Sequence, residues 1–275
     1  MLRTSRLTKL IIYAVLVVYV IIIITPFLMI FMNSFKSLRE IFLKPFSLPS
    51  QFSLKNFVEA WRRANLTSAF ANSIYVTTVS VLGILFVSSM LAYAISRYDF
   101  PFRRFLYIYI IAGLALPARL AIIPIYVILQ KLNLLDTRLG LIIVYVSTGI
   151  AFATFLLKNF MDDIPKALEE SAMIDGANPW TIFTKIDLPL IKHALVVVGV
   201  VNFVGIWNDF FFPLIIINSQ GKETVPLAIS IFFGEYSNQW NLISAALSMS
   251  VIPIMIGFFL LSRYFIVGIT QGAVK

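Results

Sequence analysis

Six apolar stretches, each long enough to cross a bilayer as a helix, constrain this chain more than any other feature. They run at about 10–32, 73–95, 105–129, 139–157, 194–217 and 242–266. A hydrocarbon core about 30 Å thick is crossed by about 20 helical residues. Because the stretches are continuously apolar rather than alternating in polarity, they predict helices and not barrel strands. We therefore predict an all-α polytopic membrane protein, with six transmembrane helices in a single domain over residues 1–275.

Composition supports a membrane protein and excludes several other classes. Charged residues make up 13% of the chain and hydrophobic residues 60%, whereas a soluble domain carries about 25% charge. The net charge of +9 indicates basic residues that flank the spans and face lipid headgroups, so we expect membrane lipid and no nucleic acid as a partner. The chain has no cysteine and only one histidine, His193, so no disulfide, thiol nucleophile or metal cluster is predicted.

The distribution of lysine and arginine predicts the orientation. If the amino terminus is cytoplasmic, twelve basic residues flank the spans on that side and nine on the other. Cytoplasmic loops are enriched in basic residues, so we predict that both termini are cytoplasmic, although the first loop alone favours the opposite. The first stretch is longer than the apolar region of a signal peptide and lacks a cleavage site, which predicts a retained span.

A polar insert separates the fourth and fifth apolar stretches. The segment from Lys158 to Lys192 contains six of the thirteen acids of the chain. Proline suits a first helical turn, glycine suits the position just past a helix end, and asparagine suits an N-cap. Pro165, Gly176 and the pair Asn178–Pro179 occupy such positions, so we predict a helix, a turn and a short second helix within 162–189. A rigid acidic segment outside the bilayer is suited to docking on a partner, and the alternative of a helix lying on anionic headgroups suits its charge poorly.

The segment EESAMIDGANPWTIFTKIDLP resembles the EAA loop of ATP-binding-cassette (ABC) importer permeases. Glu170, Ser171 and Ala172 stand for its Glu-Ala-Ala, Gly176 for its glycine, and 188–189 for its Leu-Pro ending. Ser171 departs from alanine but is also small. Further segments resemble the carbohydrate-uptake group, and among them the shorter, six-span permease subunit of the maltose type: TPFLMIFMNSFKS, ANSIYVTTVSVL, AYAISRYDFPFRR, IPIYVILQKLNLLDT, FVGIWNDFFFPL and ITQGAVK.

The resemblance implies a type I ABC importer permease fold with a cytoplasmic helix-turn-helix coupling loop. It also implies a bacterial or archaeal inner membrane, a second homologous permease subunit, two cytoplasmic ATPase subunits that bind ATP and Mg, and an extracytoplasmic sugar-binding protein. The chain has no Gly-x-x-x-x-Gly-Lys-Ser/Thr phosphate loop, so we expect no cofactor and no catalysis in this subunit. Glu170 would pair with a basic residue of an ATPase subunit and Phe183 would anchor the second short helix. The coupling residues implied are Glu169, Glu170, Ala172, Asp175, Gly176, Phe183, Leu188 and Pro189.

Polar side chains within the apolar stretches are candidates for a substrate pathway, because such residues are expensive in a membrane and often functional. The candidates are Asn208, Trp207, Asn202, Asp209, Asn72, Thr78 and Arg119. An aromatic face beside hydrogen-bonding groups, as at Trp207 and Asn208, suits a sugar. These side chains could instead satisfy one another between helices, and the partner permease could hold most of the site. Arg119 could pair with an acid of that partner or contact substrate.

Three alternatives remain open from the residues. An importer permease of the same fold could carry another solute, such as glycerol phosphate or a peptide. A secondary transporter would need ion-coupling carboxylates within the membrane and would leave the acidic insert without a role. An intramembrane protease would need a serine with a histidine, paired aspartates or a zinc motif, whereas the only acid predicted within a span is Asp209.

Overall fold

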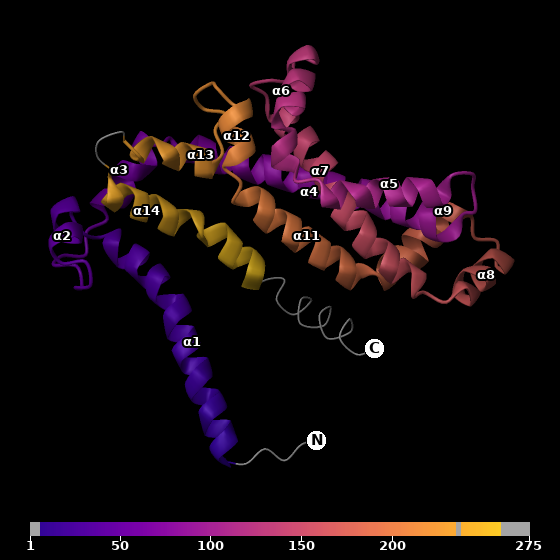
Figure 1. The fold of residues 1–275 in the computed structure, drawn as a ribbon, viewed down its shortest axis with the longest axis horizontal. Helices are drawn as coiled ribbons and strands as arrows, with labels where there is room; N and C mark the ends of the chain where they lie inside the picture. Colours follow the sequence, from indigo (N-terminus) through magenta and orange to yellow (C-terminus); the bar gives the residue numbers. More distant parts are fainter. Residues whose placement is uncertain (1–5, 235–237, 260–275) are drawn as a thin grey trace. The chain divides into compact units, whose positions relative to one another are not determined.

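The computed structural model describes residues 6–234 and 238–259, which are helical almost throughout (Figure 1). Among these residues the only β pairing is an isolated bridge between Phe233 and Asn238, so the predicted all-α architecture is confirmed. The helices, in chain order, are α1 (Arg6–Asn33), α2 (Leu38–Leu43), α3 (Lys55–Arg63), α4 (Leu66–Arg97), α5 (Arg103–Ala115), η1 (Ala118–Ala121), α6 (Ile122–Lys131), α7 (Arg138–Asp162), α8 (Lys166–Ile174), α9 (Pro179–Ile182), the π-helical turn η2 (Phe183–Asp187), α10 (Leu188–Leu190), α11 (Lys192–Trp207), α12 (Phe211–Ile216), α13 (Val225–Ile229), η3 (Ser230–Phe232) and α14 (Trp240–Ser250).

Four helices are long and apolar enough to cross a membrane without interruption. They are α1, α4, α7 and the helix Trp240–Phe259. These correspond to the first, second, fourth and sixth predicted spans, although residues 260–266 of the sixth lie outside the described residues. Their lengths exceed the predicted stretches at several ends because polar residues continue a helix beyond the hydrocarbon core.

The third and fifth predicted spans are broken. Within the third, the segments Arg103–Ala115 and Ala118–Lys131 meet at 91°. The fifth follows a bend outside its predicted bounds, where Pro179–Leu190 of the polar insert meets Lys192–Trp207 at 74°. Pro117 has no backbone N–H and disfavours a helical residue before it, and Leu116 is accordingly extended (φ −97°, ψ 113°). Helix α11 ends at Trp207 and not near 217, and α12 begins only after the polar pair 208–209.

The described chain divides into two compact units, which we describe separately. Unit 1 comprises the described residues of Met1–Leu66 and Ala228–Pro253. Within it, α1 and α3 both contact α14. Asn56 connects these segments: its Nδ2 donates to the carbonyls of Ser34 (2.8 Å) and Lys36 (2.9 Å), and its Oδ1 accepts from Asn241 Nδ2 (2.9 Å). One partly buried amide therefore satisfies backbone carbonyls just after the end of α1.

Unit 2 comprises the described residues of Thr67–Leu227 and Ile254–Lys275. Helix α7 contacts α5, α11 and α12, and one core cluster joins residues of α4, α7 and α11, including Ile84, Leu157 and Val198. Small residues let the α4 and α7 backbones approach, as is common between membrane helices. A Cβ added at Gly83 of α4 would come within 2.9 Å of a Val146 methyl group of α7.

The start of α4 holds the loop that precedes α13. Asn72 is 3% exposed, and its Nδ2 donates to the carbonyls of Gly221 (2.9 Å) and Glu223 (3.0 Å). The neighbouring Ser73 Oγ accepts from the backbone N–H of Val225 at 2.8 Å. These bonds supply partners for three backbone groups that no helix satisfies, so Asn72 has a structural role in this loop.

The substitution Asn72→Leu should therefore destabilise the protein. Leucine has a similar volume but cannot donate, so two carbonyls lose their partners, which costs about 1–3 kcal/mol. Thermal unfolding of the purified protein in detergent would measure the loss as a lower midpoint. Asn218→Leu is the matched control, because Asn218 is exposed. Equal midpoints for the two variants would contradict this role of Asn72.

Candidate functional site

The polar insert folds as the predicted helix, turn and second helical segment. Helix α8 covers Lys166–Ile174, and Gly176 follows in the left-handed region (φ 83°). The N–H groups of Gly176 and Ala177 donate to the carbonyls of Met173 (3.0 Å) and Ala172 (2.9 Å), which closes the helix end. Asn178 Oδ1 then accepts from the N–H of Thr181 at 2.9 Å and caps α9. We call residues 165–190 the coupling segment.

One face of α8 is open to solvent. Glu170 and Asp175 are exposed, and so are Leu168, Met173 and Ile174, of which Ile174 is 87% exposed. Ala172 is partly buried. Its side chain is only a methyl group, so the backbone of α8 is open to close approach at this position. Acidic groups therefore border an exposed apolar patch, a combination that marks a docking surface more often than a solvated one.

The opposite face of α8 carries a buried ionic cluster, formed by Arg97, Glu169 and Asp187. Arg97 Nε contacts Glu169 Oε1, and Arg97 Nη2 lies 3.8 Å from Asp187 Oδ1. The side chains of Arg97 and Glu169 are 7% exposed and that of Asp187 is fully buried. One guanidinium thus faces two carboxylates, and it joins the end of α4 to both α8 and η2.

The excess carboxylate affects the protonation of Asp187. Burial, followed by the neighbouring Glu169, raises the pKa of Asp187 to about 6, while Arg97 acts in the opposite direction. As pH falls through this value, Asp187 takes up a proton and the cluster approaches one carboxylate per guanidinium. The charge balance of the cluster is therefore sensitive to pH near neutrality.

The second half of the coupling segment packs into unit 2. Phe183 is 4% exposed and belongs to the core cluster of Leu157 and Met161, with Leu188 packed against the same cluster. The Phe183 ring lies 4.9 Å from that of Tyr93 in α4. Pro189 is exposed. The segment is therefore anchored by its own aromatic side chain and not only by charge.

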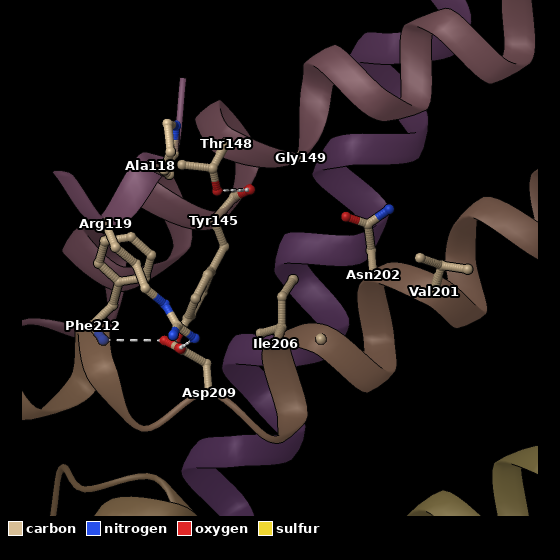
Figure 2. Close-up of a pocket in the computed structure, with 12 residues that line it drawn as sticks. Ala118, Arg119, Tyr145, Thr148, Gly149, Val201, Asn202, Ile206, Asp209 and Phe212 are labelled. Carbon is tan, nitrogen blue, oxygen red and sulfur yellow. Dashed lines mark hydrogen bonds and ion pairs between the residues drawn. The ribbon is translucent and has the colours of Figure 1, made fainter. Parts of the chain in front are cut away.

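A cavity of about 430 Å³ lies between the break at Pro117, α7 and α11 (Figure 2). Asp209 is its central polar group, since Oδ2 accepts from Tyr145 Oη (2.9 Å) and from the N–H of Phe212 (3.1 Å). Arg119 Nη2 lies 3.7 Å from Asp209 Oδ1. We call this the pathway cavity, defined by the residues that line it: Pro117, Ala118, Arg119, Tyr145, Thr148, Gly149, Val201, Asn202, Gly205, Ile206, Asp209 and Phe212.

Polar groups in the pathway cavity retain capacity for a ligand. The Arg119 side chain is 71% exposed and its contact with Asp209 is long, so several of its five donors are not taken up by any residue that the structure describes. Phe212 adds an aromatic ring to the lining. Asn202 donates through Nδ2 to the carbonyl of Val198 at 2.9 Å, which leaves Oδ1 as an acceptor. Donors, an acceptor and an aromatic ring are together suited to a polyhydroxylated ligand.

The structure brings together three of the predicted pathway residues and places four elsewhere. Asn202, Asp209 and Arg119 line the pathway cavity. Trp207 is 2% exposed, and its ring stacks on that of Phe203 (5.8 Å, 9°). Asn208 is exposed and donates to the carbonyl of Val204, and the remaining two, Asn72 and Thr78, do not line the cavity.

Sequence reasoning missed two groups of residues. Tyr145 and Thr148 lie one turn apart in α7 and line the pathway cavity; the signal was available, because they are polar residues at helical spacing in an apolar span. Arg97 is one of the twelve basic residues that flank the predicted spans and lies in the segment AYAISRYDFPFRR, and nothing local pairs it with acids 72 and 90 positions later. Among the described residues no group of three or more acids, histidines or cysteines could hold a metal ion.

Comparisons with known proteins agree with this geometry. A family model for the binding-protein-dependent transport system inner membrane component matches residues 84–270. The chain is 33% identical to the diacetylchitobiose uptake system permease protein NgcG of Streptomyces coelicolor, over 96% of this chain and 88% of that one. It is 36% identical to the probable starch degradation products transport system permease protein AmyC of Thermoanaerobacterium thermosulfurigenes, over 92% of each chain.

Solved structures show the same fold. A chain of a bacterial ABC transporter involved in the import of the acidic polysaccharide alginate superposes with a TM-score of 0.84, at 24% identity, over 96% of this chain and all of that one. A chain of the MetNI methionine ABC transporter superposes with a TM-score of 0.57, at 16% identity, over 74% and 95%. The chain therefore has the ABC importer permease fold, and it belongs to the family of binding-protein-dependent transport system inner membrane components.

Proposed function

We propose that this chain is one permease subunit of an ATP-driven importer that moves a sugar or oligosaccharide into the cytoplasm. Similarity over almost the whole chain to permeases named for diacetylchitobiose and for starch degradation products supports carbohydrate as the substrate class. Fold alone does not decide the substrate, because a methionine transporter shares it. Identifying the ligand of the extracytoplasmic protein that copurifies with this chain tests the assignment, and a peptide or glycerol phosphate would overturn it.

The remaining subunits follow from the same proposal. A second permease subunit completes the pathway, two cytoplasmic ATPase subunits bind ATP and Mg, and an extracytoplasmic binding protein delivers the sugar. This chain supplies no catalytic group for ATP hydrolysis. Both termini and the coupling segment face the cytoplasm of a bacterial or archaeal cell, where the ATPase subunits are.

The observation that carries the proposal is the buried ionic cluster at the base of the coupling segment. Arg97 belongs to the end of a helix long enough to span the membrane, and it holds α8 and η2 through Glu169 and Asp187. Because an unpaired buried charge is strongly unfavourable, α8 cannot move far unless α4 follows. A displacement of α8 by an ATPase subunit would thus reach the membrane helices.

Glu170 has a different role from its neighbour Glu169 in this proposal. Successive residues of a helix point about 100° apart, and Glu169 is buried while Glu170 is exposed. Glu170 is available to pair with a basic residue of the ATPase subunit, beside the apolar patch of 173–174. Ala172 and Gly176 permit close backbone approach, and Asp175 ends the helix on the same open side.

Glu170→Lys should uncouple ATP hydrolysis from transport. Removal of one partner from an interfacial charge pair costs about 2–5 kcal/mol, and lysine adds repulsion. In proteoliposomes containing the assembled transporter, both sugar uptake and ATPase activity stimulated by the binding protein should fall strongly. Arg138→Glu, an exposed charge reversal at the other end of α7, is the control and should retain both. Normal uptake by the Glu170→Lys transporter would contradict the docking role.

Arg97→Gln should destabilise the protein, and Arg97→Gln/Glu169→Gln should recover part of the loss. The single variant leaves two carboxylates buried without a cation, which costs about 3–5 kcal/mol, whereas the double variant leaves one. Thermal unfolding measures this difference. Among complexes that still assemble, ATP consumed per sugar transported should rise for the single variant, because α8 is no longer held by α4. If the double variant unfolds at the same temperature as the single one, the pair does not hold these helices.

We further infer that the pathway cavity belongs to the route of the sugar. Asp209 offers a carboxylate and Arg119 offers free donors, which together suit neighbouring hydroxyl groups. Neighbouring phenylalanines supply apolar surface for a sugar ring. The proposal that Asn208 contacts substrate is retained alongside it, because Asn208 is exposed at the end of α11.

Asn202→Leu should reduce uptake while the transporter still assembles and hydrolyses ATP. Loss of one neutral hydrogen bond to substrate costs about 1 kcal/mol, which is roughly a fivefold effect on uptake at low sugar concentration. Asn208→Leu, at the C-cap of α11, separates the two candidate contacts, because Asn208 does not line the cavity. A loss of uptake for Asn208→Leu but not for Asn202→Leu would place the route outside the cavity.

A further inference from the structure

A second polar cavity, of about 500 Å³, lies at the turn between α4 and α5. Its lining includes Asp99, Arg103, Arg104, Tyr107 and, from the last turns of α7, Lys158. We call it the basic turn cavity. It lies at the same end of unit 2 as the coupling segment (Figure 1), because Lys158 is close to the end of α7 and α8 begins soon after that end. It is separate from the pathway cavity and shares no lining residue with it.

The charges of the basic turn cavity favour an anion. Three cations line it and one carboxylate, Asp99, opposes them. Lys158 is already paired with Asp162 and lies 4.8 Å from the centre of the Tyr107 ring. Arg103 and Arg104 form no ion pair with any described residue. Both arginines line the cavity, and guanidinium donors are well suited to phosphate oxygens.

Exposed aromatic residues beside these arginines indicate where the anion comes from. Phe102 is 81% exposed, Phe105 67% and Tyr109 69%. Aromatic side chains are enriched where a membrane helix meets the headgroup layer, and α5 begins here with apolar residues directly after its arginines.

We propose that the basic turn cavity binds the phosphate group of an anionic membrane lipid of the phosphatidylglycerol or cardiolipin class. Arg103 and Arg104 donate to the phosphate oxygens, and Phe102 and Phe105 contact the glycerol and upper acyl chains. Soluble phosphate shares the charge chemistry but would gain nothing from the two exposed rings. The lipid is thus a specific ligand at one site, distinct from the bilayer that surrounds every span.

Native mass spectrometry of the assembled transporter in detergent tests the proposal. The complex is incubated with equal concentrations of phosphatidylglycerol or of zwitterionic phosphatidylcholine. We expect at least tenfold greater retention of phosphatidylglycerol, and at least a tenfold loss of that retention in Arg103→Gln/Arg104→Gln. Lys131→Gln/Arg138→Gln removes two exposed cations, at the last residue of α6 and the first residue of α7, and should retain the lipid.

Two further measurements identify the source of the phosphate group and check that the variant protein remains folded. Glycerophosphoglycerol, which has the headgroup and no acyl chains, should fail to displace the lipid at equal concentration, and inorganic phosphate should also fail. Thermal unfolding in phosphatidylcholine should be unchanged by the arginine variant. Displacement by either soluble phosphate would overturn the lipid assignment. Unchanged lipid retention in the arginine variant would overturn the site, and loss of copurifying ATPase with unchanged lipid would assign these arginines to a protein contact.

Discussion

The desolvation of charge at the end of α4 is the constraint on which the coupling segment depends. Arg97 is held among Glu169 and Asp187 with almost no access to water. A buried ion pair contributes little net stability compared with apolar packing, but removal of one member is strongly destabilising. Such a cluster therefore fixes geometry more than it adds stability. It makes any position of α8 away from α4 unfavourable, which is the property that a mechanical connection requires.

The two glutamates in sequence at 169–170 show how a helix serves two surfaces at once. Glu169 faces the protein and Glu170 faces solvent. Phe183 then anchors the second half of the coupling segment in the core of unit 2, so the attachment is apolar as well as ionic. In the proposed function, the open side of α8 receives motion from an ATPase subunit and the closed side passes it to a membrane helix.

A broken span supplies the polar cavity within the same unit. Pro117 interrupts the helix between α5 and η1, and backbone that leaves helical geometry at membrane depth is tolerated only where protein or water covers it. Here the break lies against Tyr145 of α7 and Asp209, which follows α11. The acid is satisfied by a hydroxyl and a backbone N–H, and this leaves Arg119 available. The irregular backbone and the concentration of polar groups thus occur at one place.

The sequence by itself determined the fold class, the positions of most spans and the outline of the coupling segment. Each of these depends on local chemistry: apolar length sets a span, Gly176 permits a left-handed turn, and Asn178 with Pro179 starts a helix. The break in the third span was only partly visible, because a proline within an apolar run, such as Pro117, can kink a helix or interrupt it. The early end of α11 at Trp207 has no proline beside it to mark the position.

Only the tertiary structure decided which polar residues meet. Arg97 and its two acids are far apart along the chain, and no local pattern distinguishes a glutamate that will be buried from the exposed one beside it. Trp207 looked suited to a sugar, but its ring is buried against Phe203, whereas Tyr145 reaches the pathway cavity from another helix. Helical periodicity states which side chains share a face, but the packing of helices against one another decides which face is buried.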